Sequence, residues 1–232
     1  MVSHKNFDCK SVLAKLKSHS NPKNIAGMAR FGISTTNTLG VSMPILRKLG
    51  KQIGKNHKLA NELWDSEIHE ARILAGLIAD PALLTEKEME KWVNDFDSWD
   101  VCDQVCMNLF DKTVAAHKKA VEWTEREEEF VRRAGFALMA ALAFHDKKAN
   151  DADFERFLPF IEKYSFDSRN FVRKAVNWAL RQIGKRNKNL NKKAILLAEK
   201  INKQKTKSAK WISNDALREL KGESVQKRLA LK

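Results

Sequence analysis

The chain reads FVRRA at Phe130–Ala134 and FVRKA at Phe171–Ala175, an offset of 41 residues. Each copy follows an acidic or polar segment and begins a long stretch in which apolar residues recur at the helical period. Two unrelated amphipathic helices could share such a pattern by chance, and the pair alone does not exclude that alternative. The periodicity of the rest of the chain distinguishes a true repeat from such a coincidence.

The helical period continues along almost the whole sequence, and strand or hairpin signals are few. Only four prolines and nine glycines occur in 232 residues. We predict helices over residues 8–18, 21–31, 44–55, 58–65, 67–79, 85–96, 99–112, 114–124, 128–145, 151–164, 168–185, 189–203, 208–220 and 223–230. Most connections are short, as between packed helix pairs.

A period near 40 residues with two helices per unit is typical of HEAT and armadillo arrays. We therefore predict an all-α fold: a right-handed superhelix, or HEAT-like solenoid, of about five or six helix pairs. Residues 1–232 are expected to form a single domain. The second helix of each pair lines a concave surface that suits an extended partner.

Composition excludes several classes of protein. No stretch approaches the 18 consecutive apolar residues of a membrane-spanning helix. Residues 1–17 carry scattered charges and lack the apolar core of a signal peptide. Three cysteines, an odd number, argue against a disulfide framework and for a reducing compartment. We expect a cytoplasmic, monomeric protein that is neither secreted nor bound to a membrane.

The formal net charge is +14, and most of the excess lies near the C-terminus. Residues 181–232 hold 16 lysines and arginines against four acids. Clustered cations bind nucleic acids because they release the counterions condensed on the phosphates. A solvated surface is one alternative. An anionic membrane surface is another, although no stretch pairs this charge with a strongly apolar helix face.

One cationic stripe follows the second copy of the repeat. Its members are spaced to share one helix face, and they are Lys174, Trp178, Arg181 and Lys185. The flanking polar residues are Arg169, Arg173 and Asn177. Cations around an indole suit a phosphate backbone, with the ring against a sugar or base. Alternatively, Trp178 packs inward and the cations reach past it to solvent.

A second candidate is an indole and a carboxylate four residues apart. Ser98 is a good N-cap, and Asp100 would lie in the first turn, where the helix dipole favours negative charge. Trp99 and Asp103 should therefore project from the same helix face. Asp103 borders apolar residues, so its carboxylate carries function, caps a neighbouring helix or pairs with an arginine such as Arg133. Arg133 could equally pair with a glutamate of its own helix.

The chain lacks the motifs of several other enzyme classes. The six histidines show no metal-ligand spacing, and no nucleophile elbow, P-loop or dinucleotide fingerprint occurs. Cys102 and Cys106 share a helix face without further ligands nearby, so we interpret them as small core residues. We expect no metal and no cofactor.

Taken in order, several segments resemble the DNA alkylation-repair glycosylases of the AlkD type, which are built from HEAT-like helix pairs. The resemblance extends over about residues 25–220 and lies in 39–47, 98–104, 130–134, 171–181 and 209–220. It implies an enzyme that hydrolyses the N-glycosidic bond of cationic N3- or N7-alkylated purines in double-stranded DNA. It also implies action on the sugar and backbone without a base-flipping pocket. No lysine is placed to act as an imine-forming nucleophile, so we expect a monofunctional enzyme.

The resemblance assigns roles by position. It makes Asp103 the catalytic aspartate, Trp99 and Trp178 the tryptophans that contact DNA beside it, and Arg133 a backbone-binding residue. The stripe adds further DNA-binding candidates, which are Lys174, Arg181, Lys185 and Arg173. In one departure, Ser98 stands where the family often has another tryptophan.

The family's N-terminal aromatic contact has three possible counterparts, which are Met28, Arg30 and Phe31. Two further hypotheses stay open. One is a non-catalytic HEAT-like module that binds nucleic acid or an acidic protein. The other is a relative that recognises another DNA structure and excises little.

Overall fold

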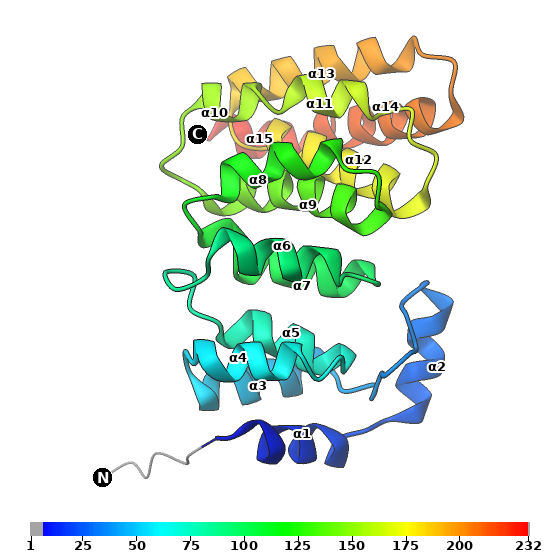
Figure 1. The fold of residues 1–232 in the computed structure, drawn as a ribbon. Coiled ribbons are helices and arrows are strands. Elements are labelled where there is room, and N and C mark those ends of the chain that lie inside the picture. The colour runs from blue at the N-terminus through cyan, green and yellow to red at the C-terminus, as the bar shows by residue number, and fades with distance from the viewer. Residues whose placement is uncertain (1–6, 232) are drawn as a thin grey trace. The chain divides into compact units, whose positions relative to one another are not determined.

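The structure is a computed structural model, and it describes residues 7–231 (Figure 1). Every regular element in that range is a helix, which confirms the all-α class. The chain divides into two compact units, unit 1 up to Thr113 and unit 2 from Val114 onward. The single domain over 1–232 stays a prediction, and each unit is described by itself.

Unit 1 is organised around helix α5. Its helices are α1 (Cys9–Ser18), α2 (Pro22–Arg30), α3 (Met43–Ile53), α4 (His57–Trp64), α5 (His69–Ile78), α6 (Glu86–Asn94), α7 (Trp99–Asn108) and the 3-10 helix η1 (Phe110–Lys112). Helix α5 packs on α3, α4 and α7, and nearly all of its residues are buried. The rings of Trp64 and Trp92 stack at 4.1 Å between centroids, which joins α4 to α6.

Helix α2 lies at an angle to the other helices of unit 1 and buries none of its residues (Figure 1). The loop after it is held by the buried carboxylate of Glu70. That carboxylate accepts hydrogen bonds from the backbone N–H groups of Leu39, Gly40 and Val41, at 2.9, 2.6 and 3.1 Å. Because three donors meet one carboxylate, the loop has a fixed position against α5.

Unit 2 contains the repeat. Its helices are α8 (Ala116–Glu122), the 3-10 helix η2 (Trp123–Glu125), α9 (Glu129–His145), α10 (Asp151–Glu155), α11 (Leu158–Lys163), α12 (Asn170–Gly184), α13 (Lys188–Asn202), α14 (Lys207–Leu220) and α15 (Glu223–Ala230). The two repeat copies begin α9 and α12, which pack on each other. Their first phenylalanines, Phe130 and Phe171, lie 5.5 Å apart between ring centroids.

Three predicted helices end earlier than expected. The helix predicted over 151–164 is two helices, α10 and α11, because Pro159 has no N–H to bond the preceding turn and can only stand in the first turn of α11. The helices predicted over 99–112 and 114–124 continue as 3-10 turns after residues 108 and 122. Such turns are common at helix ends.

Gly135 permits the close contact between α9 and the preceding 3-10 turn. A Cβ atom there would lie 2.7 Å from the backbone nitrogen of Thr124. We expect Gly135→Ala to lower the free energy of unfolding by about 1–3 kcal/mol, because overpacking outweighs the gain in helix propensity. In a chain of this size each kcal/mol lowers Tm by about 2–4 °C, measurable by circular dichroism.

Gly27→Ala is the matched control, since a Cβ there meets nothing within 4 Å. Gly27 also lies within a helix, α2, so its replacement should leave Tm unchanged or slightly raised. Equal effects of the two substitutions would contradict the close-packing explanation.

Candidate nucleic-acid interface

Helix α7 begins at Trp99 with Ser98 as its N-cap, as predicted. The Ser98 side chain, however, makes no capping bond to the backbone. Its hydroxyl donates instead to the Asp100 carboxylate at 2.7 Å. Trp99 and Asp103 therefore stand one turn apart on a helix whose start is fixed by side-chain contacts.

Asp100, which is partly buried, pairs with the buried His69 of α5. The His69 Nε2 lies 2.8 Å from an Asp100 carboxylate oxygen. Burial alone would lower the pKa of His69, but the hydrogen bond and charge of Asp100 outweigh it and raise that pKa. Burial likewise opposes the charged form of Asp100, yet the bonds from His69 and Ser98 hold its pKa below the usual range. This pair anchors α7 to α5.

The Trp99 indole is attached to the end of α2. Its N–H donates to the backbone carbonyl of Phe31 at 3.1 Å, and the Phe31 side chain is 74% exposed. Met28, Arg30 and Phe31 were the three possible counterparts of the N-terminal aromatic contact. Of these, Phe31 is the exposed aromatic residue that is bonded to Trp99. A cavity of about 370 Å³ adjoins it, lined by Met28, Val41, His69 and others.

Asp103 is half-buried on α7, between the buried Cys102 and Cys106. Burial raises the pKa of the Cys106 thiol well above its ordinary value, so this sulfur stays protonated. Both cysteines therefore pack as small core residues, which confirms their predicted role. Among residues 7–231, no group of three or more His, Cys, Asp or Glu side chains gathers as a metal site would.

The cationic stripe lies on α12, where acids of α14 meet it. Arg181 forms an ion pair with Glu219, and the Lys185 Nζ lies 2.6 Å from the same carboxylate. Burial would raise the pKa of Glu219, but Lys185 and Arg181 lower it below the usual range. The buried Asn177 donates to Asp215 at 2.7 Å, so this flanking residue belongs to the contact with α14.

The other members of the stripe differ in exposure. Lys174 is exposed and Trp178 is half-buried. The Arg173 guanidinium lies 4.7 Å from the ring of Trp211 on α14, an aromatic that the sequence analysis did not single out. Arg169 pairs with Asp167 at 2.6 Å. Lys174 is therefore the most accessible of the predicted DNA-binding residues on this helix.

Arg133 is only 5% exposed, and its guanidinium donates to the carbonyl of Phe171 at 2.6 Å. This bond ties α9 to the first turn of α12. The contact gives Arg133 a structural role within unit 2, and its contact with a DNA backbone stays a prediction.

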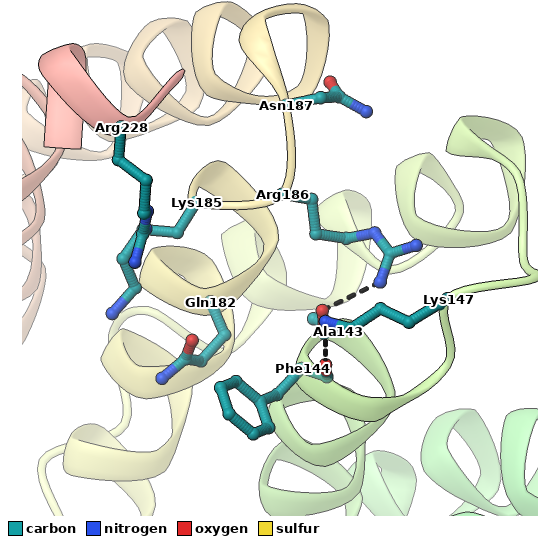
Figure 2. A pocket seen from close by; sticks show the side chains of 8 residues that line it. All are labelled: Ala143, Phe144, Lys147, Gln182, Lys185, Arg186, Asn187 and Arg228. Atoms are coloured by element: carbon teal, nitrogen blue, oxygen red, sulfur yellow. Dashed lines mark hydrogen bonds between the residues drawn. The ribbon is translucent and has the colours of Figure 1, made fainter. Parts of the chain in front are cut away.

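A basic pocket of about 480 Å³ opens at the C-terminal ends of α9 and α12 (Figure 2). Its lining includes four cationic side chains, which are Lys147, Lys185, Arg186 and Arg228. The remaining lining residues are Ala143, Phe144, Gln182 and Asn187, so no acidic side chain is among them. No sequence pattern predicted this pocket, because its cations come from three separate segments.

The family model of the DNA alkylation repair enzyme matches residues 12–220. The chain therefore belongs to the DNA alkylation repair enzyme family. No curated protein sequence matches it. In the part of the chain that the structure describes, no helix is long and apolar enough to cross a membrane.

A solved structure matches 96% of this chain and 96% of its own, with a TM-score of 0.78 and 19% sequence identity. It is described as belonging to "a new family of proteins related to the HEAT-like repeat DNA glycosylases with affinity for branched DNA structures". At this identity the likeness shows the fold, and it confirms the predicted HEAT-like helical array.

The His69–Asp100 pair makes stability depend on pH. The raised pKa of His69 contributes stability below its ordinary value of 6.5, and this is lost as pH rises through the folded value. The lowered pKa of Asp100 contributes above 3.8 and is lost as pH falls through its folded value. We expect Asp100→Asn to cost about 1–3 kcal/mol, most between about pH 4 and 6.5.

Urea unfolding in a mildly acidic and a mildly alkaline buffer measures this difference. The deficit of the variant should shrink in the alkaline buffer, where His69 is neutral. Glu62→Gln, at an exposed position in α4, is the control and should show no such trend. A deficit that is equal in the two buffers would contradict the charged pair.

Proposed function

We propose that the protein is a monofunctional DNA glycosylase that hydrolyses the N-glycosidic bond of cationic N3- or N7-alkylated purines in double-stranded DNA. The observation that carries the proposal is the placement of Asp103 one turn after Trp99 on α7, a helix anchored by the His69–Asp100 pair. Membership in the DNA alkylation repair enzyme family supports it. We further propose that it acts as a cytoplasmic monomer without a cofactor.

The proposed reaction needs a carboxylate to stabilise positive charge more than it needs a general acid to protonate the leaving base. Alkylation at N3 or N7 makes the purine a cation that leaves as a neutral base, so its departure requires little protonation. Positive charge develops on the deoxyribose as the C–N bond breaks. Asp103 stabilises that charge and orients the water that adds to C1′, and the water releases one proton to solvent.

An aromatic side chain of unit 1 would assist at the same sugar. Electron-rich indole faces attract a cation, so Trp99, on the same helix as Asp103, suits a contact with the oxocarbenium ion. For Trp178 of unit 2 we propose a contact with a sugar or base of the bound DNA. We add Phe31 to this set because its carbonyl accepts the Trp99 N–H and its ring is exposed. Such contacts act on sugar and backbone, which fits an enzyme that needs no base-flipping pocket.

The DNA backbone would be bound by cations of α9 and α12. Among the predicted residues, Lys174 is exposed, while Arg181 and Lys185 share the carboxylate of Glu219. Arg133 and Arg173 are held by Phe171 and by the Trp211 ring. We propose that Lys174 binds a phosphate directly. The other cations would attract the DNA by raising the positive electrostatic potential of this surface.

A second candidate function is recognition of branched DNA with little excision. The description of the similar solved structure favours it, since that protein belongs to a family with affinity for branched DNA structures. Ser98 also favours weak excision, because AlkD-type glycosylases often have a tryptophan at this position and this chain has a hydroxyl. Release of alkylated base from duplex DNA separates the two candidates.

We expect Asp103→Asn to lower the release of 7-methylguanine from methylated duplex by at least about 100-fold, because the amide cannot balance the charge on the sugar. Binding to the same duplex should change little. Chromatography of the released base measures the first quantity, and fluorescence anisotropy the second. Asp97→Asn, at an exposed position six residues earlier, is the control.

Full excision by Asp103→Asn would overturn the catalytic role of this carboxylate. Absence of excision in the unmodified protein, together with preferential binding of a four-way junction over a duplex, would favour the second candidate. A thermal melt of each variant shows whether the half-buried Asp103 also affects folding.

We expect Lys174→Gln to weaken duplex binding and to reduce the slope of log K against log salt by about 0.9, the value for one phosphate contact. Anisotropy titrations at several salt concentrations measure the slope. Lys192→Gln, at an exposed position on α13, is the control. An unchanged slope would place Lys174 away from the DNA. Arg181 is unsuited to this test, because its loss also leaves Glu219 with one cation fewer.

A further inference from the structure

We propose that the basic pocket of unit 2 binds one unpaired nucleotide of a DNA strand, with its phosphate between Arg228 and Lys147 and its base against the ring of Phe144. This inference rests on the proposed function only in taking DNA as the partner. The pocket is lined only by residues of unit 2, whereas Asp103 belongs to unit 1. Of the stripe, only Lys185 lines it.

The charge of the pocket selects an anion. Four cations line it without an acidic side chain among the lining residues. The Lys185 amine is paired with Glu219, whereas Arg228 is exposed on α15 and lines the same pocket (Figure 2). Burial lowers the pKa of Arg186, and the nearby Asp146 and Asp151 only partly offset this effect. The guanidinium stays charged, so an anion in the pocket would gain from its field.

The aromatic wall distinguishes a nucleotide from a bare phosphate. Phe144 is 52% exposed at the end of α9 and lines the same pocket as the four cations. The Lys147 Nζ lies 5.2 Å from the centre of the ring, and the same amine donates to the Phe144 carbonyl. A stacking face beside cations is the arrangement that binds single-stranded nucleic acid.

The walls are fixed before any ligand arrives. Arg186 donates to the Ala143 carbonyl at 2.8 Å (Figure 2). It also donates to the Ala149 carbonyl at 3.2 Å. These two bonds join the turn after α12 to the end of α9 and to the loop that follows. Asn187 caps α13 and donates to Asp151 at 2.6 Å. At about 480 Å³ the pocket lies within the roughly 300–1,000 Å³ of small-molecule sites. A preformed site loses less entropy on binding.

An intact duplex offers the pocket only phosphates. Its bases are stacked on one another and their faces are covered, so Phe144 gains a partner only where a base is unpaired, as in a tail, a gap or a branch point. The proposal therefore predicts a preference for partly single-stranded DNA that resides in unit 2 and is independent of excision.

The test compares a blunt duplex with the same duplex carrying a short single-stranded tail, by fluorescence anisotropy with the full chain. The unmodified protein should bind the tailed duplex about tenfold more tightly. Phe144→Ala should remove most of that preference and leave blunt-duplex binding unchanged, while Phe144→Trp should retain it. Arg228→Ala should weaken tailed-duplex binding and lower its salt slope by roughly 0.7, the single-strand value.

Two exposed positions of unit 2 provide matched controls. Phe166→Ala removes a ring of similar exposure, 54%, and Lys205→Ala removes a cation near the other end of α13. Both should keep the preference. Equal binding of the two DNAs by the unmodified protein would overturn the proposal, as would equal losses for both DNAs in Phe144→Ala and Arg228→Ala.

Excision from an ordinary methylated duplex is measured on the same variants. If the unmodified protein excises but shows no tail preference, the inference fails and the proposed glycosylase function stands. If it shows a Phe144-dependent preference without excision, the inference stands and the glycosylase function fails.

Discussion

In each unit, polar contacts that recur at one spacing along the chain link helices of successive repeats. In unit 1 the spacing is 31 residues, as from His69 to Asp100. In unit 2 it is 38 residues, as from Arg133 to Phe171 and from Arg181 to Glu219. Apolar side chains would tolerate sliding between neighbouring helices, but a charged group fixes one register, because a displaced charge would stand unpaired in a half-buried layer. The positions of Arg133, Arg181 and the start of α7 depend on that register.

Because of these contacts, the net charge overstates the number of cations available to DNA. The sequence predicts a DNA-binding stripe on α12, but two of its cations share a carboxylate of α14 in the structure. A large positive total is therefore not the same as a large positive surface. Within unit 2, cations gather without a lining acid at the ends of α9 and α12, where segments distant in sequence meet.

Much of the fold could be predicted because it follows from local rules. The helical period gave the helices, and the repeated FVRRA segment gave their pairing. Pro159 ended a helix that the period alone would have continued. Only part of the candidate site could be predicted from local sequence patterns. The start of α7 at Trp99 was predicted from its own residues, whereas the His69 partner of Asp100 and the acids beside Arg181 were not, since no local pattern encodes a neighbour in the next repeat.

Helix α2 differs from the other helices of unit 1 in its burial. None of its residues is buried, while the loop after it is fixed by Glu70 and the residue that ends it holds the Trp99 indole. Substitutions on this helix therefore cost the core little. Because α2 contributes little to the core, substitutions on it could change what the neighbouring Trp99 indole contacts without unfolding unit 1.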